Sequence, residues 1–211
     1  FDFRLKYAFC GGGPYDPVAT IDWYFAQEGH KVQYAVAGPL ILKGQISGNP
    51  DLFSSVKYED YLTDSYKNSG IDTMYNAPKS NTTAKINSAI ETKFGNRSLD
   101  NIFKPELFTQ YTESSGVLAT PLIESLKRNV LTDGSWFPKT PMWLFHVEND
   151  KVVPFVNFEH AKVAWGGRGV LQTSTCTVGG AETALLGDEH TTGGYKFYIQ
   201  VLLNPTVNPQ D

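Results

Sequence analysis

The sequence predicts an α/β protein in which a few parallel strands are interrupted by a long, mostly helical insertion. Residues 141–147 form a continuous apolar run, which is typical of a strand buried in a parallel sheet. Residues 170–178 are rich in alternating β-branched side chains, which indicates another strand. Residues 1–9 alternate apolar and polar and then turn apolar, so the chain opens inside a strand. Residues 28–135 carry few strand signals, and about a hundred mostly helical residues are too many for a simple crossover connection.

The last third of the chain alternates strand and helix. Helices are expected at 154–165 and 191–203, each following one of the two C-terminal strands. Near the N-terminus a helix is expected at 17–27, where Pro17 suits the first turn. Because strand–helix–strand–helix order brings the chain back in the same direction, the strands are expected to be parallel with right-handed crossovers.

The insertion has helical signals of its own. Apolar residues recur at helical spacing in 78–95. Ser80 or Asn81 could cap the start of this helix, and Gly95 suits its end. Three further helices are expected in the insertion: 52–66, 105–114, and 120–129 with Thr120 as its cap. The many aromatic side chains of the insertion suit an apolar substrate pocket, but an ordinary helical core is the default expectation.

Length and charge narrow the class of protein. The chain has 211 residues, of which 41% are hydrophobic and 13% aromatic, which is enough for one substantial core. We expect residues 1–27 and 136–211 to form a core domain and residues 28–135 to form a cap. The net charge of −4, without a cluster of Lys and Arg, argues against nucleic acid as a partner. No apolar run reaches the roughly 18 residues that a transmembrane helix needs.

Two cysteines do not make a disulfide scaffold. In the predicted fold, Cys10 and Cys176 end strands that are separated by a third strand, so a direct bridge between them is not expected. Asn81 and Asn96 begin glycosylation sequons, for which chance occurrence is at least as good an explanation.

The strongest candidates for catalytic residues are Asp150 and His190. Asp150 lies just past the strand 141–147, at the carboxyl end, where open α/β sheets place their sites. His190 lies in a loop rich in glycine and threonine directly before a helix. An acid that orients a histidine base is a common catalytic arrangement. The alternative for Asp150 is turn chemistry, in which Asn149-Asp150 caps the following helix.

Two other candidate sites, for a metal ion and for a phosphate group, have weaker support in the sequence. His146, Glu148 and Asp150 alternate along the chain, so in an extended strand they would face one side. Together with His190 they could make a metal site of oxygen and nitrogen ligands, but the strand is expected to turn into a loop by Glu148, and no metal is expected. The run Gly11–Gly13 lacks the Gly-Lys-Ser/Thr ending of a phosphate loop and is interpreted as a turn that lets backbone approach a site.

Two segments resemble a known superfamily. Residues 140–154, T-P-M-W-L-F-H-V-E-N-D-K-V-V-P, are similar to the acid-bearing segment of secreted lipases, esterases and related peptidases of the α/β-hydrolase superfamily. Residues 9–16, F-C-G-G-G-P-Y-D, resemble the strand and loop after the nucleophile helix in secretory-lipase-like members. The resemblance implies a partial α/β-hydrolase fold with a helical cap, with Asp150 as triad acid and His190 as triad base. Tyr15 and His146 are the candidate substrate-binding residues, and no cofactor is expected.

The nucleophile of that superfamily has no counterpart in the sequence. The G-x-S-x-G elbow is absent, and the superfamily places its serine before the acid and the histidine. Ser69 and Ser115 lie in the expected cap without a preceding strand, so neither makes an elbow. We therefore expect the C-terminal part of a serine hydrolase acting on esters or lipid-like substrates, secreted or periplasmic, and inactive without a part that carries the serine. The alternatives are a non-catalytic remnant or binding module of this fold and a peptidase of the same fold.

An open strand edge follows from this interpretation. Within a complete fold the strand 1–9 would have neighbours on both sides, and alone it presents an apolar edge prone to pairing. We expect an N-terminal fragment or a second chain to cover it.

Overall fold

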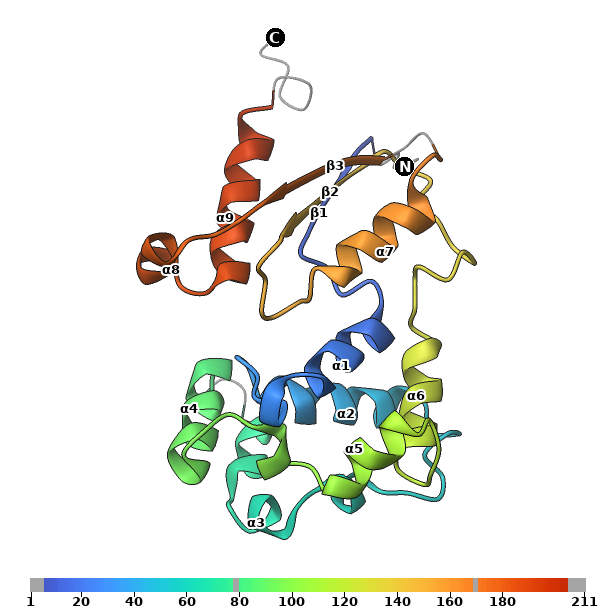
Figure 1. Cartoon of the computed structure of the whole chain (residues 1–211), viewed down its shortest axis with the longest axis vertical. Helices are drawn as coiled ribbons and strands as arrows, with labels where there is room; N and C mark the ends of the chain where they lie inside the picture. The colour runs from blue at the N-terminus through green and yellow to red at the C-terminus, as the bar shows by residue number, and fades with distance from the viewer. Residues whose placement is uncertain (1–5, 78–79, 169–170, 205–211) are drawn as a thin grey trace. The chain divides into compact units, whose positions relative to one another are not determined.

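The structure, a computed structural model, describes residues 6–77, 80–168 and 171–204 (Figure 1). It separates into two compact units. One consists of Phe1–Thr20 and Asn129–Asp211, and the other of Ile21–Arg128. The first unit contains the strands and is α/β, whereas the described part of the second is built from helices and turns. The helical insertion thus begins and ends a few residues earlier than the sequence suggests.

The α/β unit is built on three parallel strands. They are β1 (Ala8–Gly11), β2 (Met142–Val147) and β3 (Leu171–Cys176), in the order β1-β2-β3. The predicted α/β class with parallel strands is confirmed. The predicted strand 1–9 is shorter than expected, since β1 begins at Ala8 and residues 1–5 lie outside the described part of the chain.

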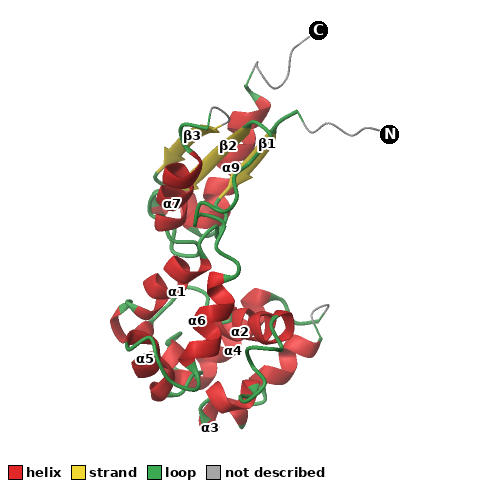
Figure 2. Cartoon of the chain, turned by 90° about the vertical axis from the view of Figure 1, so that its right-hand side faces the viewer, coloured by secondary structure: helices red, strands yellow, loops and turns green. Residues whose placement is uncertain are grey.

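Strand β2 forms the centre of this sheet, and each of its six residues is buried. The strand can be apolar throughout because a helix covers each face of the sheet: α7 (Val156–Trp165) on one face and α9 (Glu189–Leu202) on the other (Figures 1 and 2). Alternate side chains of β2 pack in two clusters. Met142 and Leu144 pack with Phe158, Ala161 and Trp165 of α7, and Trp143, Phe145 and Val147 pack with Val178 and with Phe197 of α9.

The two C-terminal helices match the expected segments within two residues at each end. A short helix that the sequence did not predict, α8 (Gly180–Leu186), lies between β3 and α9. Cys10 and Cys176 lie in the outer strands β1 and β3, with β2 between them, and both are free thiols.

The second unit contains most of the helices. The helices, with α1 crossing the boundary between the units, are α1 (Pro17–Phe25), α2 (Ala37–Gly48), α3 (Asp64–Lys67), α4 (Thr83–Phe94), α5 (Pro105–Thr112) and α6 (Ala119–Lys127) (Figure 1). Short 3₁₀ turns connect them: Glu28–His30, Tyr58–Tyr61, Ile71–Asn76 and Leu99–Asn101. The core of the unit includes Tyr61 and Tyr66, which are fully buried.

Several expected details of this unit are wrong. The cap of α4 is Thr82, whose hydroxyl accepts the Lys85 N–H, and neither Ser80 nor Asn81 has this role. Helix α6 begins at Ala119, so Thr120 lies inside it and does not cap it. The segment 52–66 is mostly turns and does not form one helix. Gly95, with φ of +77°, ends α4 as expected.

Candidate active site

The fold brings Asp150 and His190 into contact. Asp150 lies in the turn that follows β2, and His190 lies in the first turn of α9. Their side chains meet with 2.7 Å between His190 Nδ1 and Asp150 Oδ2. Asp188 caps α9 by accepting the Thr191 N–H at 2.7 Å, and this bond fixes the turn that carries the histidine.

The two oxygens of the Asp150 carboxylate have different partners. Oδ1 accepts the backbone N–H groups of Val152 and Val153 at 2.8 and 3.0 Å, so Asp150 has the expected turn chemistry. It does not cap the following helix, because the N-cap residue of α7 is Phe155, without a side-chain cap bond. Oδ2 is thereby left to face His190. Because only 1% of the Asp150 side chain is exposed, its orientation is set by these bonds, and solvent hardly competes for it. The turn bonds and the contact with His190 are therefore compatible, one on each oxygen.

His146 lies beneath this turn and is fully buried. Its Nε2 donates a hydrogen bond to the Val153 carbonyl at 2.9 Å and lies 3.7 Å from Asp150 Oδ2. Burial lowers the pKa of His146, so the ring is neutral with its proton on Nε2. Although the sequence suggested a substrate-binding residue, the structure places His146 where it braces the 150–153 turn and has no exposed surface.

The His190 ring packs directly against the backbone of Gly12. The Gly12 backbone has φ of +62°, and a Cβ there would lie 2.7 Å from His190 Cε1. The glycine turn after β1 therefore lets backbone lie directly against the ring. Beside it is a hollow of about 40 Å³, room for little more than a water or two. The hollow is lined by Gly11, Gly12, Phe145, Val147, Asp150, His190 and Gly194, a set that contains no hydroxyl or thiol.

A second glycine, Gly193, lets the helix that carries His190 pack close to the sheet. A Cβ at Gly193 would collide with Val147 Cγ2 of the central strand, so α9 approaches the sheet at a distance that only glycine permits. On the next helical turn the Phe197 ring stacks on Phe145 with 4.7 Å between centroids. Gly193 was not among the predicted site residues, although a Gly-Gly pair inside a helix is a signal that could have identified it.

The electrostatics of His190 favour its charged form. The hydrogen bond to Asp150 is the largest cause that raises the pKa of His190, burial opposes it, and the charges of Asp150 and Asp188 add to the rise. The side chain remains 35% exposed, so its outer edge is accessible. Such a histidine can exchange a proton with a group outside the chain while its inner nitrogen stays hydrogen-bonded.

An NMR titration of His190 tests this electrostatic picture. We expect its pKa in the folded chain to lie above that of an ordinary histidine and to fall in an Asp150→Asn variant, because the largest cause of the rise is removed. The sign also sets the effect on stability: the favourable interaction of charged His190 is fully present below the pKa of the unfolded chain and is lost as pH rises through the folded pKa. An unchanged pKa in Asp150→Asn would contradict the pairing.

Tyr15, the other substrate-binding candidate, is part of the packing of the α/β unit. Its ring meets Trp165 edge-on at 5.2 Å between centroids, and its carbonyl accepts the Leu131 N–H at 2.9 Å. Burial raises the pKa of its hydroxyl. Tyr15 does not line the hollow beside His190.

The described side chains do not form a metal site. Across the described residues, no group of three or more His, Cys, Asp or Glu side chains is arranged to hold an ion. Glu148, just past the end of β2, instead accepts a hydrogen bond from Thr175 at 2.7 Å, and both residues are exposed. Among the residues that the structure describes, no helix is long and apolar enough to cross a membrane.

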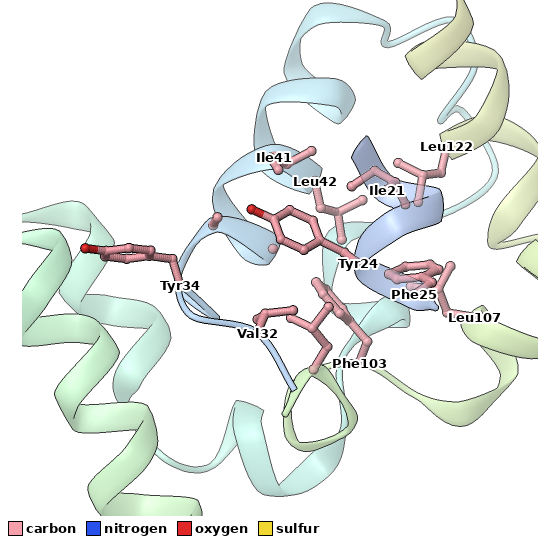
Figure 3. A pocket seen from close by; sticks show the side chains of 13 residues that line it. Ile21, Tyr24, Phe25, Val32, Tyr34, Ile41, Leu42, Phe103, Leu107 and Leu122 are labelled. Carbon is pink, nitrogen blue, oxygen red and sulfur yellow. The ribbon is translucent and has the colours of Figure 1, made fainter. Parts of the chain in front are cut away.

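The helical unit contains an apolar cavity of its own (Figure 3). Its volume is about 30 Å³ on the measure that gives about 40 Å³ for the hollow beside His190, which is far below the several hundred Å³ that is usual for small-molecule sites. Its lining carries no charged side chain: Ile21, Tyr24, Phe25, Val32, Tyr34, Ala37, Gly38, Ile41, Leu42, Leu99, Phe103, Leu107 and Leu122. Among the aromatic residues of the insertion, Tyr61 and Tyr66 lie in the core, as the default expectation has it, and Phe103 lines the cavity.

Solved structures with a similar fold are forms of one esterase. The chain superposes on the G231F mutant of the rice cell wall degrading esterase LipA from Xanthomonas oryzae with a TM-score of 0.71 and 16% sequence identity, over 98% of this chain and 52% of that one. A crystal structure of LipA without a named substitution gives a TM-score of 0.63 and 17% identity, over 94% and 48%. No protein-family model and no curated protein matches the chain. The chain therefore has an α/β fold that matches part of an esterase structure and spans about half of its length.

Proposed function

We propose that this chain is the acid- and base-bearing part of a serine esterase. The observation that carries the proposal is the buried Asp150 carboxylate, fixed by two backbone amides and hydrogen-bonded to the accessible His190 at 2.7 Å. The likeness to an esterase fold supports this choice over other uses of an Asp–His pair. The substrate class is a carboxylic ester.

The mechanism assigns one task to each nitrogen of His190. Nδ1–H donates to Asp150 Oδ2, which holds the ring in the tautomer whose Nε2 can accept a proton. Nε2 takes the proton of a serine hydroxyl as the serine attacks the ester carbonyl, and later returns it to the leaving alcohol. Asp150 stabilises the imidazolium that forms between these steps. Because the base must be neutral, the raised pKa of His190 sets the acidic limit of activity at a higher pH than an ordinary histidine would.

The serine and its oxyanion amides are proposed to lie outside these 211 residues. We therefore expect no ester turnover from the chain alone, and turnover from a polypeptide that also carries the segment encoded upstream of Phe1. The measurement is hydrolysis of p-nitrophenyl acetate and butyrate by both samples under the same conditions. Turnover by the chain alone that is abolished by His190→Ala would show that the nucleophile is internal. Absence of turnover in the longer polypeptide would favour a non-catalytic module.

A further inference from the structure

Asn149, the residue before the proposed acid, pairs its side-chain amide with the backbone of Val178. Its Nδ2 donates a hydrogen bond to the Val178 carbonyl at 2.8 Å, and its Oδ1 accepts the Val178 N–H at 3.0 Å. Two residues of antiparallel strands exchange the same two bonds through their backbones. The pair joins positions 29 residues apart, so it is a tertiary contact and not part of the local turn.

This pair lies just beyond the point where β2 and β3 stop pairing. The two strands are in register as far as Val147 and Cys176. The chain then turns, with the Asp150 N–H donating to the Val147 carbonyl at 3.2 Å, so the backbone of β2 provides no partner for Val178. Val178 is only 3% exposed, and a buried backbone N–H or carbonyl without a partner is costly. The amide of Asn149 therefore takes the place of a neighbouring strand.

The type of side chain at position 149 is suited to both bonds. A carboxamide carries a donor and an acceptor side by side, as a peptide group does, whereas a carboxylate only accepts. Asp150 is already fixed through Oδ1 by two amides of its own turn. Asn149 adds a bond from that turn to a different part of the chain.

The segment that follows β3 is in turn tied to α9. Val178 packs with Phe197 of α9 in one apolar cluster. Lys196 of the same helix donates a hydrogen bond to the Thr177 carbonyl at 3.3 Å. Because these contacts hold the helix, they also limit where its first turn, which carries His190, can lie.

We propose that Asn149 is a positioning residue, which keeps Asp150 and His190 at hydrogen-bonding distance by joining the turn after β2 to the segment after β3. This inference rests on the proposed function. Without the bonds to Val178, the 150–153 turn keeps its internal bonds but loses this link to the elements that carry His190. Asn149 does not bond to either of the two residues through its side chain, so it acts on their placement and takes no part in the proton transfer.

Two NMR measurements on the isolated chain test this placement. Hydrogen exchange is expected to show a protected Val178 N–H in the unmodified chain, because this amide has Asn149 as its acceptor. In Asn149→Ala the Val178 amide is expected to exchange at least about tenfold faster. The pKa of His190 is expected to fall in the same variant, because a longer contact with Asp150 weakens the largest cause of its rise. An unprotected Val178 amide in the unmodified chain, or an unchanged pKa of His190 in the variant, would overturn the proposal.

Ser174→Ala is the matched control for a general loss of stability. Trp143 Nε1 donates a hydrogen bond to Ser174 Oγ at 2.8 Å, a side-chain bond that also joins β2 to β3 but lies within the paired strands. Both variants are expected to lower the urea midpoint, whereas only Asn149→Ala is expected to lower the pKa of His190. Equal changes of this pKa in the two variants would give Asn149 a merely structural role and overturn the proposal.

Ester turnover separates the positioning role from the proposed function. In the polypeptide that also carries the segment encoded upstream of Phe1, Asn149→Ala is expected to lower kcat for p-nitrophenyl acetate by about 10–100-fold and to leave KM nearly unchanged, because a small misplacement of the base is costly in the chemical step. An unchanged kcat in an active polypeptide would overturn the positioning role and leave the proposed function standing. A lower pKa of His190 in Asn149→Ala, without turnover by the unmodified longer polypeptide, would support the placement by Asn149 and remove the proposed function.

Discussion

In the polypeptide that carries the nucleophile, His190→Ala and Asp150→Asn are each expected to lower kcat for ester hydrolysis by about 10⁴-fold or more. Alanine removes the base. Asparagine keeps the shape of the aspartate but presents an N–H group to His190 Nδ1, which selects the tautomer with its proton on Nε2. That tautomer cannot accept the serine proton. Because both residues are proposed to act in the chemical step, KM for a p-nitrophenyl ester is expected to change much less than kcat.

The chain contains a matched control for this experiment. His160 Nδ1 lies 2.8 Å from Asp16 Oδ2, a distance close to that of the proposed catalytic pair. Asp16, however, caps the start of α1 through the Ala19 N–H, and its own N–H donates to Asn157. His160→Ala is therefore expected to retain near-normal kcat. Activity that depends on His160 and tolerates His190→Ala would reverse the assignment.

The sequence could place Asp150 just past a strand because residues 141–147 form a continuous apolar run, whereas its role as triad acid was implied by the superfamily resemblance. An apolar run ending in an acid places that acid at the carboxyl end of a strand, whatever the rest of the fold does. The partner came from a superfamily resemblance, and the 2.7 Å contact with His190 joins residues that α7, β3 and α8 separate along the chain. The pairing was thus a hypothesis that only the tertiary structure could place in space.

The structural role of His146 could not be predicted from the alternation of residues in the sequence. Its alternation with Glu148 and Asp150 would place the three side chains on one side of an extended strand, although the strand was expected to turn into a loop by Glu148. In the structure the strand ends at Val147, and the following turn folds back so that Val153 accepts a hydrogen bond from His146. The direction of the Glu148 side chain then depends on Thr175 of β3, a contact far away in sequence.

The predicted helices and their boundaries were wrong where the local sequence signals were ambiguous. Helix α2 escaped prediction because its residues 37–48 include three glycines and a proline, which have low helical propensity, and tertiary packing overrides that propensity. The segment 52–66 was predicted as one helix, but only its last three residues belong to a helix, α3, and the others form turns around the buried Tyr61. The cap of α4 moved by one or two positions because Ser80, Asn81 and Thr82 are all good caps, and local sequence does not rank them.

Gly193→Ala is expected to destabilise the chain by about 1–3 kcal/mol, although alanine is the better helix former. The added Cβ would occupy the position of Val147 Cγ2, and β2 is buried on both faces, so the sheet cannot yield easily. Relief requires α9 to move away from the sheet. Since His190 lies one helical turn before Gly193 on that helix, the same movement would lengthen its contact with Asp150. Urea denaturation measures the first effect, and the His190 titration measures the second as a lower pKa.

Gly194→Ala is the matched control for this prediction, because it makes the same substitution at the adjacent position of the same helix. A Cβ at Gly194 would meet nothing within 4 Å, so helix propensity alone should act and stabilise the chain by about 0.5–1 kcal/mol. The two variants are thus expected to shift the urea midpoint in opposite directions. If Gly193→Ala were stabilising as well, α9 would not be held against Val147 as closely as the structure has it, and the position of His190 would not depend on this contact.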